Sequence, residues 1–196
     1  DIVRNQMYKV NVERKTAQKE FFDYTEYLLS LEMIADIKTF ESIYVSRIAQ
    51  LTNKTNQFNL TTKRFSQSEI ELIMADDLTI KISGRLRDKF GDNGVTSLVI
   101  GTIEDTIMNI ELWLMSCRVL KRNMEFAMMD ALVEEALEKG IKTIKGYYIK
   151  TAKNQMVKEF YGSMGFKLIG QEGENTIWQL ELEAYQSLNK VIQVNV

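Results

Sequence analysis

The first third of the chain alternates between helical and extended hydrophobic patterns. The patterns predict four elements: a helix over 16–31, a strand over 32–40, a helix over 41–51 and a short helix over 66–76. Ser66 suits the N-cap of the last helix, and Glu69 suits the capping-box position three residues later. Between the last two helices lies TNKTNQFNLTT (52–62), which is polar and rich in amides.

From residue 78 onward the pattern becomes mostly extended. Strands are predicted at 78–88, 95–105, 106–116, 141–149, 166–170 and 175–183, and helices at 124–139 and 154–165. The glycine-rich stretch KFGDNG forms a turn between the first two strands, and Gly140 is a natural C-terminal stop for the first helix. The order β-β-β-α-β-α-β-β predicts a layered α/β or α+β domain.

The strand over 106–116 alternates along its whole length. One face is predicted to carry Met108, Ile110, Leu112 and Leu114. The other face is predicted to carry Asn109, Glu111, Trp113, Met115 and, if the pleat continues, Cys117.

Composition restricts the class of protein. A chain of 196 residues, 45% of them hydrophobic, suits one domain, or one domain with an arm. The single cysteine excludes an internal disulfide framework and suits a reducing compartment. No apolar run reaches membrane-spanning length and no secretion signal is visible, which predicts a cytoplasmic protein without a membrane partner. The net charge of −2 gives no electrostatic argument for nucleic acid.

Two residue types are missing. The sequence has no histidine, which excludes histidine-based triads and, with a single cysteine, any Cys/His metal site. Only carboxylates could hold a hard cation, and no metal site is predicted. It also has no proline, although average usage would give roughly ten. The chain starts at Asp1 rather than Met, which favours a piece cut from a longer polypeptide.

The helix over 124–139 is entered through R-x-x-K-x-N, formed by Arg118, Lys121 and Asn123. Further on, the spacing N-x-x-V-x-x-x-Y-x-x-x-G-F matches the last helix of GNAT acyltransferases, with valine in an alanine position; its residues are Asn154, Val157, Tyr161, Gly165 and Phe166. The chain therefore resembles the GNAT fold: a central, mostly antiparallel sheet flanked by helices, here with an N-terminal helix–strand extension.

Three longer strings resemble one family more specifically. They are LTNKTNQFNLTT (51–62), RLRDKFGDNGV (85–95) and MSCRVLKRNMEFA (115–127), and they are similar to the C-terminal half of FkbH-like proteins. The resemblance implies transfer of a glyceryl group from 1,3-bisphosphoglycerate to an acyl carrier protein, often toward methoxymalonyl units. It also implies a haloacid-dehalogenase-type phosphatase domain, whose D-x-D-x-[TV] motif is absent from this chain. The expected division is a leading segment over 1–65 and the acyl-transfer domain over 66–196.

The resemblance implies an acyl thioester on a cysteine, and Cys117 is the only cysteine. Nearby Arg118, Lys121 and Arg122 and the start of a helix would favour the thiolate. On the predicted strand face, Trp113 would lie beside the thiol and Glu111 could accept its proton. The alternative is a buried cysteine that acts as a small apolar residue.

The cofactor could be coenzyme A or the phosphopantetheine arm of a carrier protein. Lys121 and Asn123 stand at both glycine positions of the GNAT loop, where side chains would crowd a pyrophosphate. A single phosphate needs less of this cradle, which favours the carrier-protein arm; Lys121 could pair with it, alongside Arg118 and Arg122. Asn123 could instead cap the helix, and Asn154 could hold a pantetheine amide or cap its own helix.

Other candidates have equally plain structural explanations. Amides and hydroxyls in the 52–62 segment suit a hydroxylated glyceryl group or ordinary Asx turns; they are Asn56, Gln57, Asn59 and Thr61. Asp88 could serve the substrate site or the adjacent turn. Tyr161 stands where GNAT enzymes keep the tyrosine that protonates the leaving thiolate, or it packs against the last strands. Methionines at helical spacing are more often core than docking surface; they are Met115, Met124, Met128 and Met129.

The leading hypothesis is glyceryl transfer through Cys117 to a carrier protein. Glu111 or water would take protons, backbone N–H groups near the helix start would hold the oxyanion, and Tyr161 would serve as acid. Two rivals are an acetyl-CoA-dependent N-acetyltransferase and a non-catalytic module that docks a carrier protein or a phosphatase domain.

Overall fold

One eight-stranded sheet organises the computed structural model, which describes residues 2–21 and 23–195. Its strands are β1 (Ile34–Thr39), β2 (Thr79–Asp88), β3 (Gly91–Glu104), β4 (Ile107–Met115), β5 (Thr143–Tyr148), β6 (Lys167–Glu172), β7 (Asn175–Glu181) and β8 (Gln193–Asn195). The order across the sheet is β6-β7-β5-β4-β3-β2-β1-β8. Only the β4–β5 and β1–β8 pairs are parallel, so the predicted mostly antiparallel sheet is confirmed.

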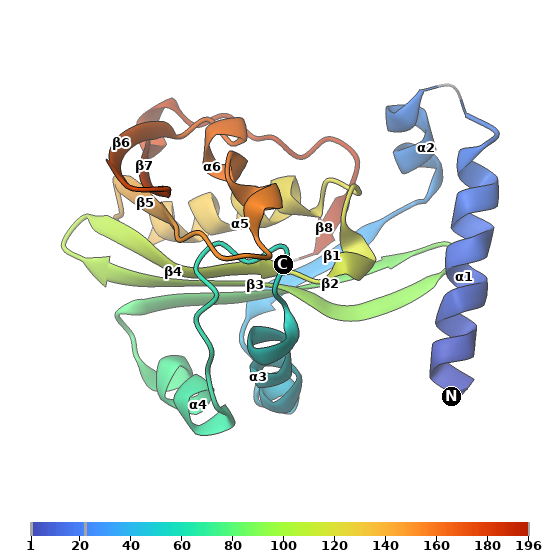
Figure 1. Cartoon of the computed structure of the whole chain (residues 1–196), viewed down its shortest axis with the longest axis horizontal. Helices are drawn as coiled ribbons and strands as arrows, with labels where there is room; N and C mark the ends of the chain where they lie inside the picture. The colour runs from blue at the N-terminus through green and yellow to red at the C-terminus, as the bar shows by residue number, and fades with distance from the viewer. Residues whose placement is uncertain (1, 22, 196) are drawn as a thin grey trace.

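Helices cover both faces of this sheet. They are α1 (Ile2–Gln18), α2 (Tyr24–Ser30), α3 (Val45–Lys54), α4 (Gln67–Ala75), α5 (Met124–Glu138) and α6 (Phe160–Ser163). The helices α3 and α4 lie on one face, α5 and α6 on the other, and α1 stands beside the end of the β2–β3 hairpin (Figure 1). The strand β1 pairs with β2, so residues of the leading segment belong to the same sheet.

The N-terminal helix predicted over 16–31 is two helices. The helix α1 ends at Gln18, and Asp23 then caps α2 by accepting a hydrogen bond from the Thr25 N–H. An aspartate at this position satisfies a free N–H and starts a new helix rather than continuing the old one. Phe22, which the prediction included, lies outside the described residues.

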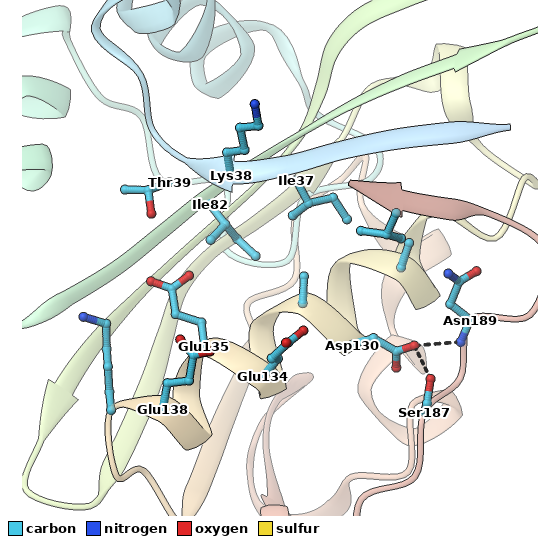
Figure 2. A pocket seen from close by; sticks show the side chains of 14 residues that line it. Ile37, Lys38, Thr39, Ile82, Asp130, Glu134, Glu135, Glu138, Ser187 and Asn189 are labelled. Atoms are coloured by element: carbon cyan, nitrogen blue, oxygen red, sulfur yellow. Dashed lines mark hydrogen bonds between the residues drawn. The ribbon is translucent and has the colours of Figure 1, made fainter. Parts of the chain in front are cut away.

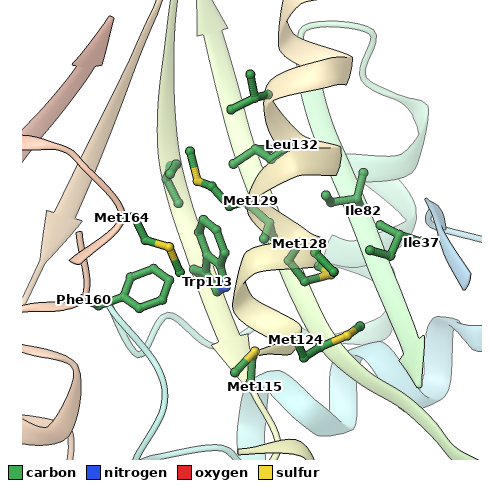
Figure 3. Packing of buried hydrophobic residues seen from close by; sticks show 14 of the residues in the cluster. Ile37, Ile82, Trp113, Met115, Met124, Met128, Met129, Leu132, Phe160 and Met164 are labelled. Atoms are coloured by element: carbon green, nitrogen blue, oxygen red, sulfur yellow. The ribbon is translucent and has the colours of Figure 1, made fainter. Parts of the chain in front are cut away.

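Local signals elsewhere are confirmed. The Ser66 hydroxyl accepts from the Glu69 N–H at 3.2 Å and donates to its carboxylate at 3.1 Å. Gly140 ends α5 with a φ of +76°, a left-handed conformation that favours glycine. The four methionines singled out in the sequence are all buried between α5 and the sheet (Figure 3); they are Met115, Met124, Met128 and Met129. They are core residues, which removes the docking-surface alternative.

The strand β4 carries a bulge that the alternating sequence does not reveal. Its pairing with β3 passes from Leu112 to Ile110 and leaves Glu111 as the extra residue. A bulge reverses which side chains face which layer. Met108 and Ile110 therefore share the α5 side with Trp113 and Met115, whereas Leu112 and Leu114 face α3 and α4. The prediction of two continuous strand faces is wrong.

The C-terminal region is less helical than predicted. Residues 154–165 form a short 3₁₀ turn (Gln155–Val157) followed by the single-turn α6. The strand β8 was not predicted, and it extends the sheet beyond β1. No helix in the described part of the chain combines the length and apolar character needed to cross a bilayer.

Candidate functional site

Cys117 lies just beyond the end of β4, in a loop that leads into α5. The strand ends at Met115, and a 3₁₀ turn, η2 (Cys117–Val119), begins at the cysteine. The prediction that the pleat continues to Cys117 is therefore wrong, and so is the alternative of a buried thiol, because Cys117 is exposed. Solvent and ligands can reach the sulfur directly.

The loop between Cys117 and α5 has an unusual backbone. Lys121 and Asn123 both hold left-handed conformations, with φ of 64° and 62°. These are the two positions at which the GNAT motif has glycine, the residue that adopts this conformation most easily. Asn123 occupies the predicted N-cap position of α5, but its side chain makes no capping hydrogen bond among the described residues.

Backbone donors collect in this loop. Among the described residues, none of the N–H groups from Leu120 to Met124 donates to a protein acceptor. Together with the start of the 15-residue helix α5, they form a region that favours an anion. Arg118 and Lys121 are exposed beside it.

The N-terminal helices hold this loop from one side. The Tyr24 hydroxyl donates to the Lys121 carbonyl oxygen. Arg122 is buried, and it donates to the Arg118 carbonyl oxygen at 2.8 Å and to the Asp88 carboxylate at 3.4 Å. Burial and the charge of Arg14 lower the pKa of Arg122. Arg122 thus acts within the loop, and only Arg118 and Lys121 of the predicted cations are free to meet a ligand.

Asp88 is the centre of a buried ionic network. Its side chain is 0% exposed and accepts two hydrogen bonds from Arg14, at 2.7 and 2.9 Å. It also accepts from the N–H groups of Phe90 and Gly91. The predicted substrate role of Asp88 is not supported, because every approach to the carboxylate is filled by protein.

Glu111 occupies the β4 bulge and points into a polar cavity away from Cys117. Its carboxylate accepts from Lys63 and, at 3.0 Å, from the Thr102 hydroxyl. The cavity has a volume of about 460 Å³ and also contains Tyr147. Four residues of strand, each about 3.3 Å long, separate Glu111 from the end of β4. The predicted pairing of Glu111 as base with Cys117 is therefore wrong.

Trp113 and Tyr161 are core residues. Both are 0% exposed, and both pack edge-on against Phe160, at ring-centroid distances of 4.9 and 5.3 Å. Among the described residues, the Trp113 indole N–H has no hydrogen-bond partner, and the Tyr161 hydroxyl has no side-chain partner and lies near the backbone N–H of Tyr147. Desolvation raises the pKa of Tyr161 far above its ordinary value. Neither residue can contact a substrate at Cys117 in this conformation, so the predicted acid and substrate roles are not supported.

Much of the amide-rich segment is buried. Asn59 and Thr61 are buried, and the Asn59 amide donates to the Thr55 carbonyl oxygen at 3.1 Å. Asn56 accepts from Arg64, and Gln57 is exposed. Of the four residues predicted to recognise substrate, only Asn56 and Gln57 remain accessible. Asn154 is also fully buried, and its side chain binds protein rather than capping its turn.

A broad groove lies elsewhere, between α5 and the strands β1 and β8. It has a volume of about 820 Å³, with Ile37 and Ile82 on the sheet side and acidic side chains on the helix side (Figure 2). Asp130 at its edge accepts hydrogen bonds from the C-terminal loop, including the N–H of Asn189 at 3.0 Å. The carboxylates of α5 disfavour a phosphate here, and no predicted site residue lines the groove. Among the described residues no cluster of metal-ligating side chains occurs.

Comparison with solved structures identifies the fold. No family model and no curated protein matches the chain. The ribosomal-protein-S18-alanine N-acetyltransferase from Escherichia coli is 12% identical, with a TM-score of 0.57 over 80% of this chain and 100% of that one. The PaiA N-acetyltransferase from Thermoplasma acidophilum, solved with coenzyme A, is 13% identical, with a TM-score of 0.58 over 75% and 98%. The fold is that of the GNAT acetyltransferases. An acetyltransferase of the GNAT family from Streptococcus pneumoniae gives 14% identity and a TM-score of 0.58 over 76% and 99%.

The GNAT fold implies a coenzyme A-type ligand, and this chain fits it only in part. The left-handed turns and free N–H groups at 120–124 suit a phosphate. The adjacent edge of β4, where an extended arm with amide groups would pair, is already hydrogen-bonded to residues 58–61. The phosphate end of such a ligand is accommodated, and the amide-bearing end is not.

Sequence reasoning missed two features of this region. The Arg14–Asp88 pair joins residues 74 positions apart. The insertion of residues 58–61 beside β4 depends on a gap that only the folded sheet creates. The sequence held one hint of this insertion, the stretch FNL at 58–60. Two large apolar residues, Phe58 and Leu60, would be unusual in a solvated loop, and both are buried.

Proposed function

We propose that this chain is an acyltransferase that accepts an acyl group on Cys117 and passes it to the pantetheine thiol of an acyl carrier protein. The observation that carries the proposal is the position of the single cysteine. Its sulfur is exposed at the start of a loop whose N–H groups from Leu120 to Met124 have no protein acceptor among the described residues. The GNAT fold and the FkbH-like strings both support acyl transfer at this loop.

The chemistry needs a thiolate and an oxyanion site. The Cys117 thiolate attacks the carbonyl carbon of an acyl phosphate, a C–S bond forms, and the C–O bond to phosphate breaks as phosphate leaves with the electron pair. The pantetheine thiolate then attacks the thioester carbonyl and Cys117 leaves as thiolate. The N–H groups of the loop would hold the carbonyl oxygen as it gains charge. Because Cys117 is exposed, its proton passes to water and no protein base is required.

The acyl group we propose is glyceryl or phosphoglyceryl. Arg118 and Lys121 are exposed next to the thiol and would attract a phosphorylated donor. Gln57 and Asn56 offer accessible amides for hydroxyl groups. A haloacid-dehalogenase-type phosphatase domain, in the same polypeptide or separate, would remove the remaining phosphate.

Acetyl-CoA-dependent N-acetyl transfer is a second candidate. It is favoured by the left-handed Lys121 and Asn123, which give the loop the backbone turns expected of glycines. The filled β4 edge disfavours it. A calorimetric titration with coenzyme A decides between the two, since the second candidate requires binding and the first does not.

The deciding experiment is intact-protein mass spectrometry after incubation with a glyceryl-loaded carrier protein. Wild type should gain one glyceryl mass that hydroxylamine removes, and Cys117→Ala should gain none. Ser116→Ala, next to the thiol, is the matched control and should acylate like wild type. If folded wild type forms no adduct and Cys117→Ala still supports loading of the carrier, the chain is a docking module rather than an acyltransferase.

A further inference from the structure

A segment of the chain itself fills a gap in the sheet between β4 and β5. The two strands pair over only three positions, from Ile107–Thr143 to Asn109–Lys145. Beyond Asn109 the outer edge of β4 no longer meets β5. Residues 58–61 take this place, and Asn59 forms an isolated antiparallel bridge with Leu114.

Hydrogen bonds join the segment to β4. The Leu60 N–H donates to the Trp113 carbonyl oxygen at 3.0 Å, and the Met115 N–H donates to the Phe58 carbonyl oxygen at 3.0 Å. The Thr61 hydroxyl donates to the Glu111 carbonyl oxygen at 2.7 Å. The carbonyl oxygens of Trp113 and Glu111 and the N–H of Met115 are thus already used.

The far side of the segment is bonded as well. The Ile149 N–H, just after β5, donates to the Leu60 carbonyl oxygen at 2.9 Å. The buried Asn154 amide donates to the carbonyl oxygens of both Asn59 and Ile149, each at 2.9 Å. The segment is therefore held from both sides, as an internal strand would be.

Side-chain packing also holds the segment in place. Leu60 is 0% exposed and Phe58 is 8% exposed. Phe58 packs edge-on against Phe160 at 5.2 Å between ring centroids. Removing the segment would expose both side chains to water and leave the β4 edge without partners, which is unfavourable on both counts.

An extended ligand that carries amides pairs naturally with a free strand edge. Pantetheine has two amides, and the β4 edge leads directly to the loop between Cys117 and α5, whose N–H groups at 120–124 suit a phosphate. We infer that residues 58–61 are a specificity element, which excludes the pantetheine of free coenzyme A from the sheet. A carrier-borne thiol must then meet Cys117 at the surface. This inference rests on the proposed function for its account of the thiol, but the exclusion of coenzyme A is independent of Cys117.

The test compares coenzyme A binding by a variant that loosens the segment with binding by a matched control. Leu60→Ala/Thr61→Val removes one fully buried apolar side chain and the hydroxyl bonded to β4. Ile80→Ala/Thr79→Val makes the same chemical change at equally buried positions in β2. Binding is measured by calorimetry with coenzyme A up to about 1 mM, and backbone exchange is followed at Leu60, Met115 and Ile149.

Wild type and the control should show no binding of coenzyme A. The loosened variant should exchange faster at the amides of Leu60, Met115 and Ile149, and it should bind coenzyme A at least about tenfold more tightly than wild type. Binding by wild type with these amides still protected would overturn the inference. So would faster exchange in the variant without any gain in binding. If the double variant does not fold, Thr61→Val against Thr79→Val provides the same comparison.

Acylation of Cys117, measured on the same proteins, separates the two proposals. Wild type that is never acylated contradicts the proposed function and leaves the coenzyme A comparison valid. Normal acylation together with no gain of binding in the loosened variant overturns the specificity element alone.

Discussion

At the scale of single residues, Tyr161 is the position where the environment changes the expected chemistry most. The resemblance gives it the role of an acid, but its hydroxyl is buried without a side-chain partner among the described residues. Desolvation holds the phenol in its neutral form by raising its pKa. Its ring instead supports Trp113 and Phe166 in the core.

Tyr161→Phe should leave the free energy of unfolding unchanged or raise it by about 1 kcal/mol, since the lost hydroxyl is buried and has no side-chain partner among the described residues. Tyr147→Phe is the control, because it loses a 2.6 Å bond to Asn109 and should cost about 1 kcal/mol. Urea denaturation measures both. A loss of acyl transfer in Tyr161→Phe at unchanged stability would restore the acid role.

Asp88→Asn should lower the free energy of unfolding by about 3–5 kcal/mol, because Arg14 and Arg122 would remain buried without their counter-charge. Asp92→Asn breaks the half-exposed pair with Arg85 in the same hairpin and should cost less than about 1 kcal/mol. Equal effects of the two substitutions in urea denaturation would show that the buried network is no stronger than a surface pair.

Local signals were readable from the sequence, and distant partners were not. Ser66 and Gly140 act on backbone groups within four residues, so the sequence around them contains their whole environment. Asp88 depends on Arg14, 74 residues away. Cys117 could be identified as a candidate from its neighbours, whereas its exposure depends on where β4 ends.

At the scale of elements, β4 explains why the predicted site separated. MNIELWLM alternates as an unbroken strand would, so nothing in the sequence shows the extra residue. The bulge at Glu111 appears only from the pairing with β3. It leaves Trp113 in the α5 core and Glu111 in a different cavity, which divides two residues that an ideal strand would have placed on one face.

The helix α5 holds the C-terminal loop through Asp130. Burial alone would raise the pKa of this carboxyl, but hydrogen bonds from Ser187, Tyr185 and the backbone N–H groups of Leu188 and Asn189 outweigh it and lower the pKa. A lowered folded-state pKa stabilises the fold above the unfolded value, about 3.9, and the contribution is lost as pH falls through the folded value.

Asp130→Asn should therefore lower the free energy of unfolding by about 1 kcal/mol at neutral pH, a figure kept small by solvent exposure. The difference from wild type should shrink toward zero below about pH 4. Glu134→Gln, an exposed position on the same helix, is the control. Urea denaturation across the pH range measures this, and a difference independent of pH would contradict the role of the charge.

At the scale of the whole molecule, the order of strands and helices from residue 78 onward was predictable because each element has a clear period. The position of the N-terminal helices was not, since the face that α1 turns toward the hairpin and the core is narrow: Arg14 is its only buried residue among those described, flanked by the half-buried Met7, Val10 and Ala17. Four other apolar residues of α1 are exposed; they are Ile2, Val3, Tyr8 and Val12. The Arg14–Asp88 pair is therefore the strongest polar contact of this helix with the hairpin, and the half-buried Val10 packs beside Gly91.

This arrangement predicts that α1 opens independently of the sheet. Hydrogen exchange should be much faster in α1 than in β3, whose central residues Leu98, Val99 and Ile100 are buried. Asp88→Asn should accelerate exchange in α1 further, because Arg14 loses its partner, while Asp130→Asn should not. If α1 were protected as strongly as β3, the helix would have to be held by contacts other than Arg14. Tyr24 of α2 contacts the loop between Cys117 and α5. The conformation of that loop would then depend on packing of the whole N-terminal segment rather than on one buried ion pair.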